Sequence, residues 1–214
     1  LVKSAFMDDE LCHHMKLTSA NSINVARFLP QAFYYFHAYA QLKRMGKEKD
    51  YVICVPSGNF GNITAAIFGQ KMGLPVKRFI AANNANDIVY QYLQTGKYEP
   101  RASQQTIANA MDVGDPSNFA RIYDLFDGSH EQIAAIMSGA TYSDSQIRQT
   151  MKACHDATGY TLDPHGACGY QALKDLLLPG EHGVFGETAH PAKFKSVVED
   201  AIGAEVQILS LIHI

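Results

Sequence analysis

"YVICVPSGNFGNITAAIFGQKMG", residues 51–73, carries the strongest signal of local structure in this sequence. It opens with an uninterrupted run of apolar residues, which is typical of a strand that is buried on both faces. Residues 56–62 are rich in Gly, Asn and Ser and predict a loop, and residues 63–72 have the apolar spacing of a helix. A glycine ends this helix, and residues 76–82 predict the next strand. We therefore expect a parallel β-α-β unit with a right-handed crossover.

Outward from this unit, the sequence predicts mainly helices. Residues 31–45, upstream, form an aromatic-rich helical stretch, whose large apolar side chains we expect to be buried in the core. These side chains are Phe33, Tyr34, Phe36, Tyr39 and Leu42. The helices predicted downstream cover residues 87–94, 117–126, 131–137, 144–158, 166–177 and 192–201, and a short strand covers residues 184–185. Asp144 is expected to cap its helix. The pattern is α/β throughout.

Composition sets limits on the class of protein. Of the 214 residues, 47% are apolar and 18% charged, so the chain can bury a substantial core, in one domain or two closely packed lobes. A net charge of −3 without a basic run gives no electrostatic footprint for nucleic acid or an anionic membrane. No apolar stretch has the length of a membrane span, and the first residues do not form a signal peptide.

The four cysteines form no CxxC pair. They predict free thiols in a reducing compartment, which we take to be the cytoplasm, or else an organelle whose targeting segment is not included here. Cys12, His13 and His14 are adjacent, and three adjacent residues in regular structure cannot all converge on one ion. We therefore expect no metal site.

The loop of residues 57–62 has the chemistry of a phosphate cradle. A helix N-terminus supplies unpaired backbone N–H groups and positive potential, and Gly58 and Gly61 allow close backbone approach. The alternative is an ordinary strand-to-helix loop with capping residues, because short glycine motifs also occur by chance. A P-loop would need a lysine after Gly61, and a dinucleotide fold would need an acidic residue where Asn83 and Asn84 stand. We therefore expect a phosphorylated ligand other than ATP or NAD.

At this loop the sequence resembles the threonine synthases, fold-type II enzymes that use pyridoxal phosphate, because PSGNFGN (56–62) is similar to their loop for the cofactor phosphate. Further segments resemble the family in the family's own order. They are NSINVARFLPQAFYYF (21–36), NDIVYQYLQTGKY (86–98), AMDVGDPSNFARI (110–122), LDPHGACGY (162–170) and TAHPAKF (188–194). The resemblance implies a fold like that of the tryptophan synthase β subunit, with a mostly parallel twisted sheet flanked by helices, here incomplete.

The resemblance also implies roles for particular residues. Those that would hold the cofactor phosphate, largely through backbone N–H groups, are Gly58, Asn59, Phe60, Gly61 and Asn62. Asn62 would also border the phosphate of the substrate, O-phosphohomoserine, which Ser22 and Arg27 would contact. A guanidinium group can bind a phosphate dianion with two parallel charged hydrogen bonds. Thr188 would face the pyridine nitrogen of the cofactor. Without the resemblance, Ser22 and Thr188 would read as helix caps and Arg27 as a solvated charge.

The implied reaction converts O-phosphohomoserine and water to threonine and phosphate, with pyridoxal phosphate as the electron sink. It needs a lysine that holds the cofactor as a Schiff base, and in the family this lysine lies upstream of the phosphate loop. Lys3, Lys16 and Lys193 lack the context of that lysine, so no catalytic residue is assigned in this chain. We expect residues 1–203 to be the phosphate-binding and C-terminal part of a threonine synthase-like domain.

On this interpretation the chain is an inactive fragment that lacks the N-terminal part of the enzyme, and residues 204–214 are a tail that could be non-native. Three further interpretations stay open. The first is another fold-type II pyridoxal phosphate enzyme, such as a lyase, a dehydratase or a β-replacement synthase. The second is a non-catalytic phosphometabolite-binding protein. The third is a nucleotide oxidoreductase, which the spacing of the loop disfavours. Ser22, Asn24 and Arg27 favour threonine synthase, because their pattern provides for a phosphorylated substrate.

Overall fold

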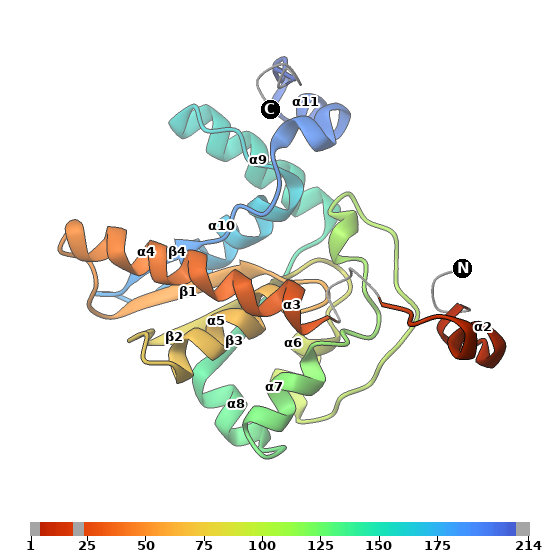
Figure 1. Ribbon diagram of the computed structural model, residues 1–214. Coiled ribbons are helices and arrows are strands. Elements are labelled where there is room, and N and C mark those ends of the chain that lie inside the picture. The colour runs from red at the N-terminus through yellow and green to blue at the C-terminus, as the bar shows by residue number, and fades with distance from the viewer. Residues whose placement is uncertain (1–4, 19–23, 209–214) are drawn as a thin grey trace.

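In the computed structural model, which describes residues 5–18 and 24–208, four parallel strands form a sheet in the order β3-β2-β1-β4 (Figure 1). The strands are β1 (Tyr51–Pro56), β2 (Arg78–Asn83), β3 (Met137–Thr141) and β4 (His182–Phe185). Helix α5 (Gly61–Lys71) connects β1 to β2, and these strands pair in parallel with Ile53 opposite Phe79. The parallel β-α-β unit and the α/β class predicted from the sequence are therefore confirmed.

The side chains of β1 alternate between two hydrophobic clusters, one on each face of the sheet. Tyr51, Ile53 and Val55 belong to the first cluster, and Val52 and Cys54 belong to the second. This double burial explains why the strand is apolar at every position.

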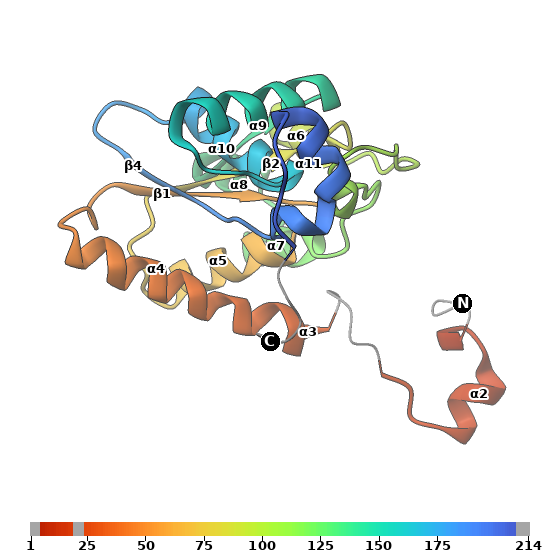
Figure 2. The same cartoon turned by 90° about the horizontal axis from the view of Figure 1, so that it is seen from above.

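Two layers of helices cover these faces. The first face is covered by α3 (Val25–Phe28), α4 (Ala32–Arg44), α5, α6 (Ile88–Thr95), α7 (Phe119–Leu125) and α8 (His130–Ile136). The second is covered by η2 (Asn109–Met111), α9 (Asp144–Thr158), α10 (Pro164–Leu176) and α11 (Lys195–Ile202). Seen from above, α4 and α5 lie on one side of the strands and α9 and α10 on the other (Figure 2).

Helix α4 buries only one stripe of its surface. Its buried residues are Ala32, Tyr35 and Leu42. Tyr39 packs partly against the same core, but Phe33 is 73% exposed, and Tyr34 and Phe36 are exposed as well. The prediction that all the aromatic side chains of this helix are buried is therefore wrong for these three. Aromatic residues occur all around the helix, so their presence did not identify the face that packs on the sheet.

Two predictions downstream of β2 need correction. Residues 137–141 form β3 directly after α8, where a helix was expected to continue to residue 137. Ser143 caps α9 instead of Asp144: its hydroxyl accepts from the N–H of Gln146, whose side chain accepts from the N–H of Ser143. Asp144 accepts a hydrogen bond from the N–H of Ile107 at 3.2 Å.

Other parts of the chain lie at the margins of the two layers. Helix α2 (Asp9–His14) buries none of its residues and stands away from the sheet in both views. The predicted helix 192–201 is divided into η3 (Pro191–Phe194) and α11. Val206 is buried in the second cluster, and the domain boundary placed after residue 203 stays a prediction. Within the described ranges, no helix combines the length and apolarity that crossing a membrane requires.

Candidate functional site

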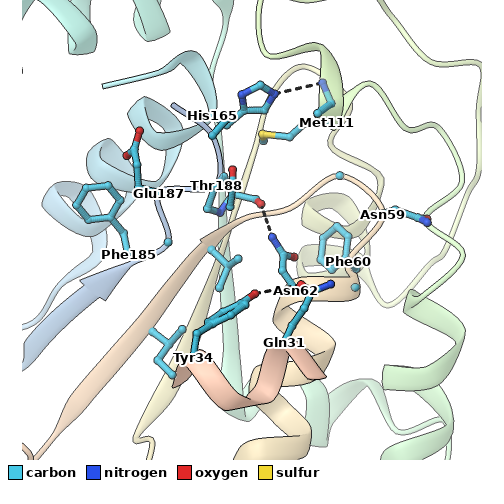
Figure 3. Close-up of a pocket in the computed structure, with 18 of the residues that line it drawn as sticks. Gln31, Tyr34, Asn59, Phe60, Asn62, Met111, His165, Phe185, Glu187 and Thr188 are labelled. Carbon is cyan, nitrogen blue, oxygen red and sulfur yellow. Dashed lines mark hydrogen bonds between the residues drawn. The ribbon is translucent and has the colours of Figure 1, made fainter. Parts of the chain in front are cut away.

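A cavity of about 720 Å³ lies at the carboxyl ends of β1 and β4. The chain runs from β1 to β2 and β3 on one side, and returns to the other side of β1 as β4. Where strand order reverses in this way, the loops after the two strands diverge and leave a crevice. Residues 58–62 after β1 and residues 186–189 after β4 line the cavity (Figure 3). The five predicted cofactor-phosphate residues and Thr188 therefore share one site.

The start of α5 carries backbone N–H groups that have no partner in the described part of the protein. The N–H groups of Gly58, Phe60, Gly61 and Asn62 donate to no acceptor there, as is usual in the first turn of a helix. Phe60, the N-cap residue, has the left-handed conformation, with φ 62° and ψ 12°. Such a residue turns successive N–H groups toward one side, which makes an anion-binding concavity.

The side chain of Asn62 braces this loop from within. Its Nδ2 donates to the carbonyl of Pro56 at 2.9 Å, and its Oδ1 accepts from the N–H of Ile63 at 2.8 Å. The hydroxyl of Ser57 also donates to Oδ1, at 3.2 Å. Asn62 lines the cavity, but its amide group is used to join the two ends of the loop (Figure 3).

Two neighbouring segments hold the loop from outside. The side chain of Asn59 points away from the cavity (Figure 3), and its Oδ1 accepts from the N–H and the hydroxyl of Ser117 at 2.7 and 2.8 Å. Gly58 lies against the segment of Ala110 and Met111. A Cβ atom at Gly58 would lie 2.6 Å from the carbonyl oxygen of Ala110 and 2.7 Å from Cα of Met111. Only glycine fits at position 58 while this segment covers the loop.

Tyr35 of α4 closes the cavity beside Asn62. Its hydroxyl donates to the carbonyl of Asn62 at 2.9 Å, and burial raises its pKa well above that of a free tyrosine. The hydroxyl therefore remains a donor at neutral pH. Tyr34 lines the same wall. Tyr34 was predicted to lie in the core and Tyr35 was not singled out, although its spacing from the buried Ala32 and Leu42 was a usable signal.

The segment that follows β4, residues 186–194, contributes Glu187, Thr188 and Lys193 to the cavity wall. Thr188 and Lys193 are both exposed and line the cavity. The ammonium group of Lys193 lies 5.7 Å from the ring centroid of Phe194. Among the described residues, no three His, Cys, Asp or Glu side chains gather as metal ligands would.

Glu187, beside Thr188, was missed because a single glutamate in a turn carries no sequence signal. Its Oε1 accepts from the N–H of Asp163 at 3.2 Å, and its Oε2 is buried without a partner in the described part of the chain. Burial raises the pKa of Glu187 to about 7. The N–H of Asp163 acts against this shift, and the charge of Asp163 adds to it. Glu187 is therefore protonated in a large fraction of molecules near neutral pH.

Asp163 and His165 form the N-terminus of α10. Asp163 is the N-cap residue, and its Oδ1 accepts from the N–H of Gly166 at 3.1 Å. His165 is 2% exposed and lines the cavity. Its Nδ1 lies 3.0 Å from Oδ1 of Asp163, and its Nε2 lies 3.2 Å from the N–H nitrogen of Ala110.

Ser22 and Arg27 were predicted to contact the phosphate of the substrate. Ser22 lies outside the described residues. Arg27 is exposed in α3 and does not line the cavity. Gln31, the last residue of η1 (Leu29–Gln31), does line it, and its Nε2 donates to the carbonyl of Arg27 at 3.1 Å. Arg27 is therefore one turn from the rim, and its contact with a phosphate stays a prediction.

Comparison with known proteins gives a consistent result. The family of pyridoxal-phosphate dependent enzymes matches residues 12–184 of this chain. The threonine synthases of Haemophilus influenzae and Escherichia coli are each 47% identical to it over 208 residues, which is 97% of this chain and 48% of each relative. The chain thus spans about half the length of these curated relatives.

Solved structures agree with the sequence comparison. The crystal structure of threonine synthase from Escherichia coli superposes with a TM-score of 0.89 at 45% identity, over 97% of this chain and 48% of that one. A pyridoxal phosphate-bound threonine synthase from Brucella melitensis superposes with a TM-score of 0.87 at 32% identity, over 97% and 49%.

Proposed function

Because this chain belongs to the pyridoxal-phosphate dependent enzyme family, we propose that it is the cofactor-phosphate-binding part of a threonine synthase, which converts O-phosphohomoserine and water to threonine and phosphate. The observation that carries the proposal is the set of N–H groups of Gly58, Phe60, Gly61 and Asn62, which have no acceptor in the described part of the chain and lie at the switch point of the sheet. The specific substrate and a cytoplasmic location are parts of the same proposal.

The residues of the cavity fit pyridoxal phosphate. A phosphate dianion needs hydrogen-bond donors and positive potential, and the loop before α5 provides N–H groups, a helix N-terminus and no acidic side chain. The cavity volume of about 720 Å³ is in the range of cofactor pockets. When bound, the cofactor supplies an electron sink for carbanion chemistry. Thr188 would offer a neutral hydroxyl to the pyridine nitrogen.

The residues of this chain would bind and orient in that reaction. Asn62 and Ser57 fix the loop, so the N–H groups are in place before a phosphate arrives, and little ordering is needed on binding. Tyr35 holds the start of α5 through the carbonyl of Asn62. Ser22 and Arg27 are proposed to meet the substrate phosphate near the rim that Gln31 lines.

The proposal assigns no cofactor lysine to this chain. Among the described residues, Lys193 is the lysine that lines the cavity. Its ammonium group lies near the ring of Phe194, on an exposed turn. We therefore propose that this chain binds the cofactor by its phosphate and does not carry out the reaction alone.

Binding of pyridoxine phosphate and of pyridoxine to the purified chain tests the phosphate site. Neither compound carries an aldehyde, so neither reacts with surface lysines, and the difference in affinity isolates the phosphate. We expect the phosphorylated compound to bind at least about tenfold more tightly, equivalent to about 1.4 kcal/mol. Titration calorimetry measures both affinities. Equal affinities would overturn the proposal.

Two glycine variants sharpen this test. Gly58→Ala should abolish the preference, because the new Cβ would lie 2.6 Å from the carbonyl oxygen of Ala110 and displace the loop or its cover. Gly139→Ala, on β3, is the matched control. Its nearest neighbours would lie at 3.3 Å, and position 139 does not line the cavity.

A further inference from the structure

His165 is a buried side chain at the cavity for which the proposed function has no use. It is 2% exposed, and its ring lies 4.8 Å from that of Phe194, measured between centroids. Asp163 holds one side of the ring at 3.0 Å. The N–H of Ala110 meets the other side at 3.2 Å, and the dashed line from His165 in Figure 3 marks this contact.

These two contacts determine where the proton of the imidazole lies. A backbone N–H can only donate, so Nε2 must accept from Ala110 and carries no proton. The ring proton is therefore on Nδ1, where it faces the carboxylate of Asp163. Asp163 is itself fixed, because its Oδ1 also accepts from the N–H of Gly166 and its own N–H donates to Glu187. The ring has one tautomer and one orientation.

The contact with Ala110 links this ring to the phosphate loop. Ala110 and Met111 form the segment that lies directly against Gly58. Asp112 anchors the far end of the segment, since its carboxylate accepts from the side chain of Asn84 at 2.8 Å and from the N–H of Thr106 at 3.0 Å.

His165 is the anchor on the cavity side of the same segment. A shift of Ala110 would change the space above the loop, because Gly58 already leaves no room for a Cβ atom.

We propose that His165 is a positioning residue of the cofactor site, which acts through Ala110 to hold the cover of the phosphate loop at Gly58. The inference rests on the proposed function, since it assumes that the loop binds a phosphate. His165 need not touch the ligand. Its acceptor nitrogen, Nε2, sets the cover, and the carboxylate of Asp163 sets the tautomer that makes Nε2 an acceptor.

Two substitutions at position 165 distinguish the loss of the acceptor for Ala110 from the loss of the imidazole ring. In His165→Gln the amide oxygen can take the place of Nε2 and accept from Ala110. In His165→Asn the shorter amide reaches only toward Asp163, and the acceptor for Ala110 is lost. We expect His165→Gln to keep most of the preference for pyridoxine phosphate over pyridoxine, and His165→Asn to reduce the preference about tenfold. A merely structural role would make the two variants alike.

His130 provides the matched control. Its Nε2 forms a hydrogen bond with the carbonyl of Leu93 at 3.1 Å, and it does not line the cavity. His130→Asn and His130→Gln should leave the preference unchanged. If His165→Asn does not give a cooperative thermal transition, Ala110→Pro removes the same hydrogen bond from the donor side, and should reduce the preference likewise.

The results distinguish a failure of this inference from a failure of the proposed function. A wild-type chain that prefers pyridoxine phosphate, a preserved preference in His165→Gln and a lost preference in His165→Asn or Ala110→Pro would support the inference. A wild-type preference that survives in a folded His165→Asn, or in Ala110→Pro where His165→Asn does not fold, would overturn the inference alone. A preference that is lost equally in His165→Gln would do the same. A wild-type chain without any preference would overturn the proposed function and the inference together.

Discussion

The carboxyl group of Glu187 occupies the space that a Cβ atom at Gly166 would need. The first turn of α10 therefore packs directly on the segment after β4, and the residue at position 187 restricts the residue at position 166. The N–H of Asp163, from the N-cap of the same helix, donates to this carboxyl group at 3.2 Å. The wall of the cavity thus depends on a contact between two segments that are distant in sequence.

Gly166→Ala should destabilise the wild-type chain by about 1 kcal/mol, because the added methyl group displaces the carboxyl group of Glu187, the end of a flexible side chain, from its hydrogen bond with the N–H of Asp163. With Glu187→Ala present, the overlap disappears, and alanine is the better helix former by about 0.5–1 kcal/mol. The effect of Gly166→Ala should then be neutral or stabilising. Urea unfolding of the wild type, the two single variants and the double variant measures the coupling free energy between positions 166 and 187.

The matched control for this cycle is Gly169→Ala, in the same helix, where a Cβ atom would meet its nearest neighbours at 3.4 Å. That change should show no coupling to Glu187→Ala. Additive effects of Gly166→Ala and Glu187→Ala would contradict the contact.

Glu187 should also make stability depend on pH. Its pKa is raised from 4.5 to about 7, first by burial, so the folded chain keeps a proton that the unfolded chain releases. This contribution is fully present below about pH 4.5 and is lost as the pH rises toward 7. With allowance for the partial exposure of Glu187, we expect the free energy of unfolding to fall by about 1–2 kcal/mol as the pH rises from 5 to 8. The difference in unfolding free energy between wild type and Glu187→Gln, measured at pH 5 and pH 8, should show it.

Glu187→Gln should gain on the wild type as the pH rises across this interval. Glu131→Gln, at an exposed position in the first turn of α8, is the control and should not. A difference between wild type and Glu187→Gln that stays constant from pH 5 to pH 8 would refute the assignment.

Local features of the chain were predictable from sequence, whereas choices between faces and between distant neighbours were not. The strand at residues 51–55 and the loop after it were predicted, because burial on both faces and helix capping leave their signals within a few residues. The face of α4 that packs on the sheet was not predicted, because Phe33 and Tyr35 are both aromatic. Only tertiary packing buries Tyr35 and leaves Phe33 exposed. Strand β3 was missed because "MSGAT" carries no β-branched or alternating pattern before its last residue.

The candidate site divides in the same way. Residues 58–62 and Thr188 were assigned to one site from the family resemblance of their motifs, and they line one cavity. Their roles toward a cofactor stay predictions. His165 and Glu187 were missed as site residues because their significance comes from partners that the sequence does not place beside them. Tertiary contacts between α10, the segment after β4 and the cover of the loop decide these positions, and no local propensity encodes them.

The last prediction concerns turnover. Incubated with pyridoxal phosphate and O-phosphohomoserine, the purified chain should release no threonine and no phosphate above the rate of a sample without protein. The physical reason is that the reaction needs a lysine held against the cofactor, and Lys193, the lysine that lines the cavity in the described part of the chain, is exposed beside Phe194. Amino-acid analysis and a phosphate assay measure the two products.

The matched variant for this experiment is Lys193→Ala, which should leave the preference for pyridoxine phosphate over pyridoxine unchanged and should not alter the background rate. Threonine formation by the wild-type chain that Lys193→Ala abolishes would show that Lys193 serves as the lysine that the reaction needs. Threonine formation that survives this change would point to another amine of the chain. Either form of turnover would refute the expectation that the chain is inactive alone, while the phosphate site would still be tested by the binding preference.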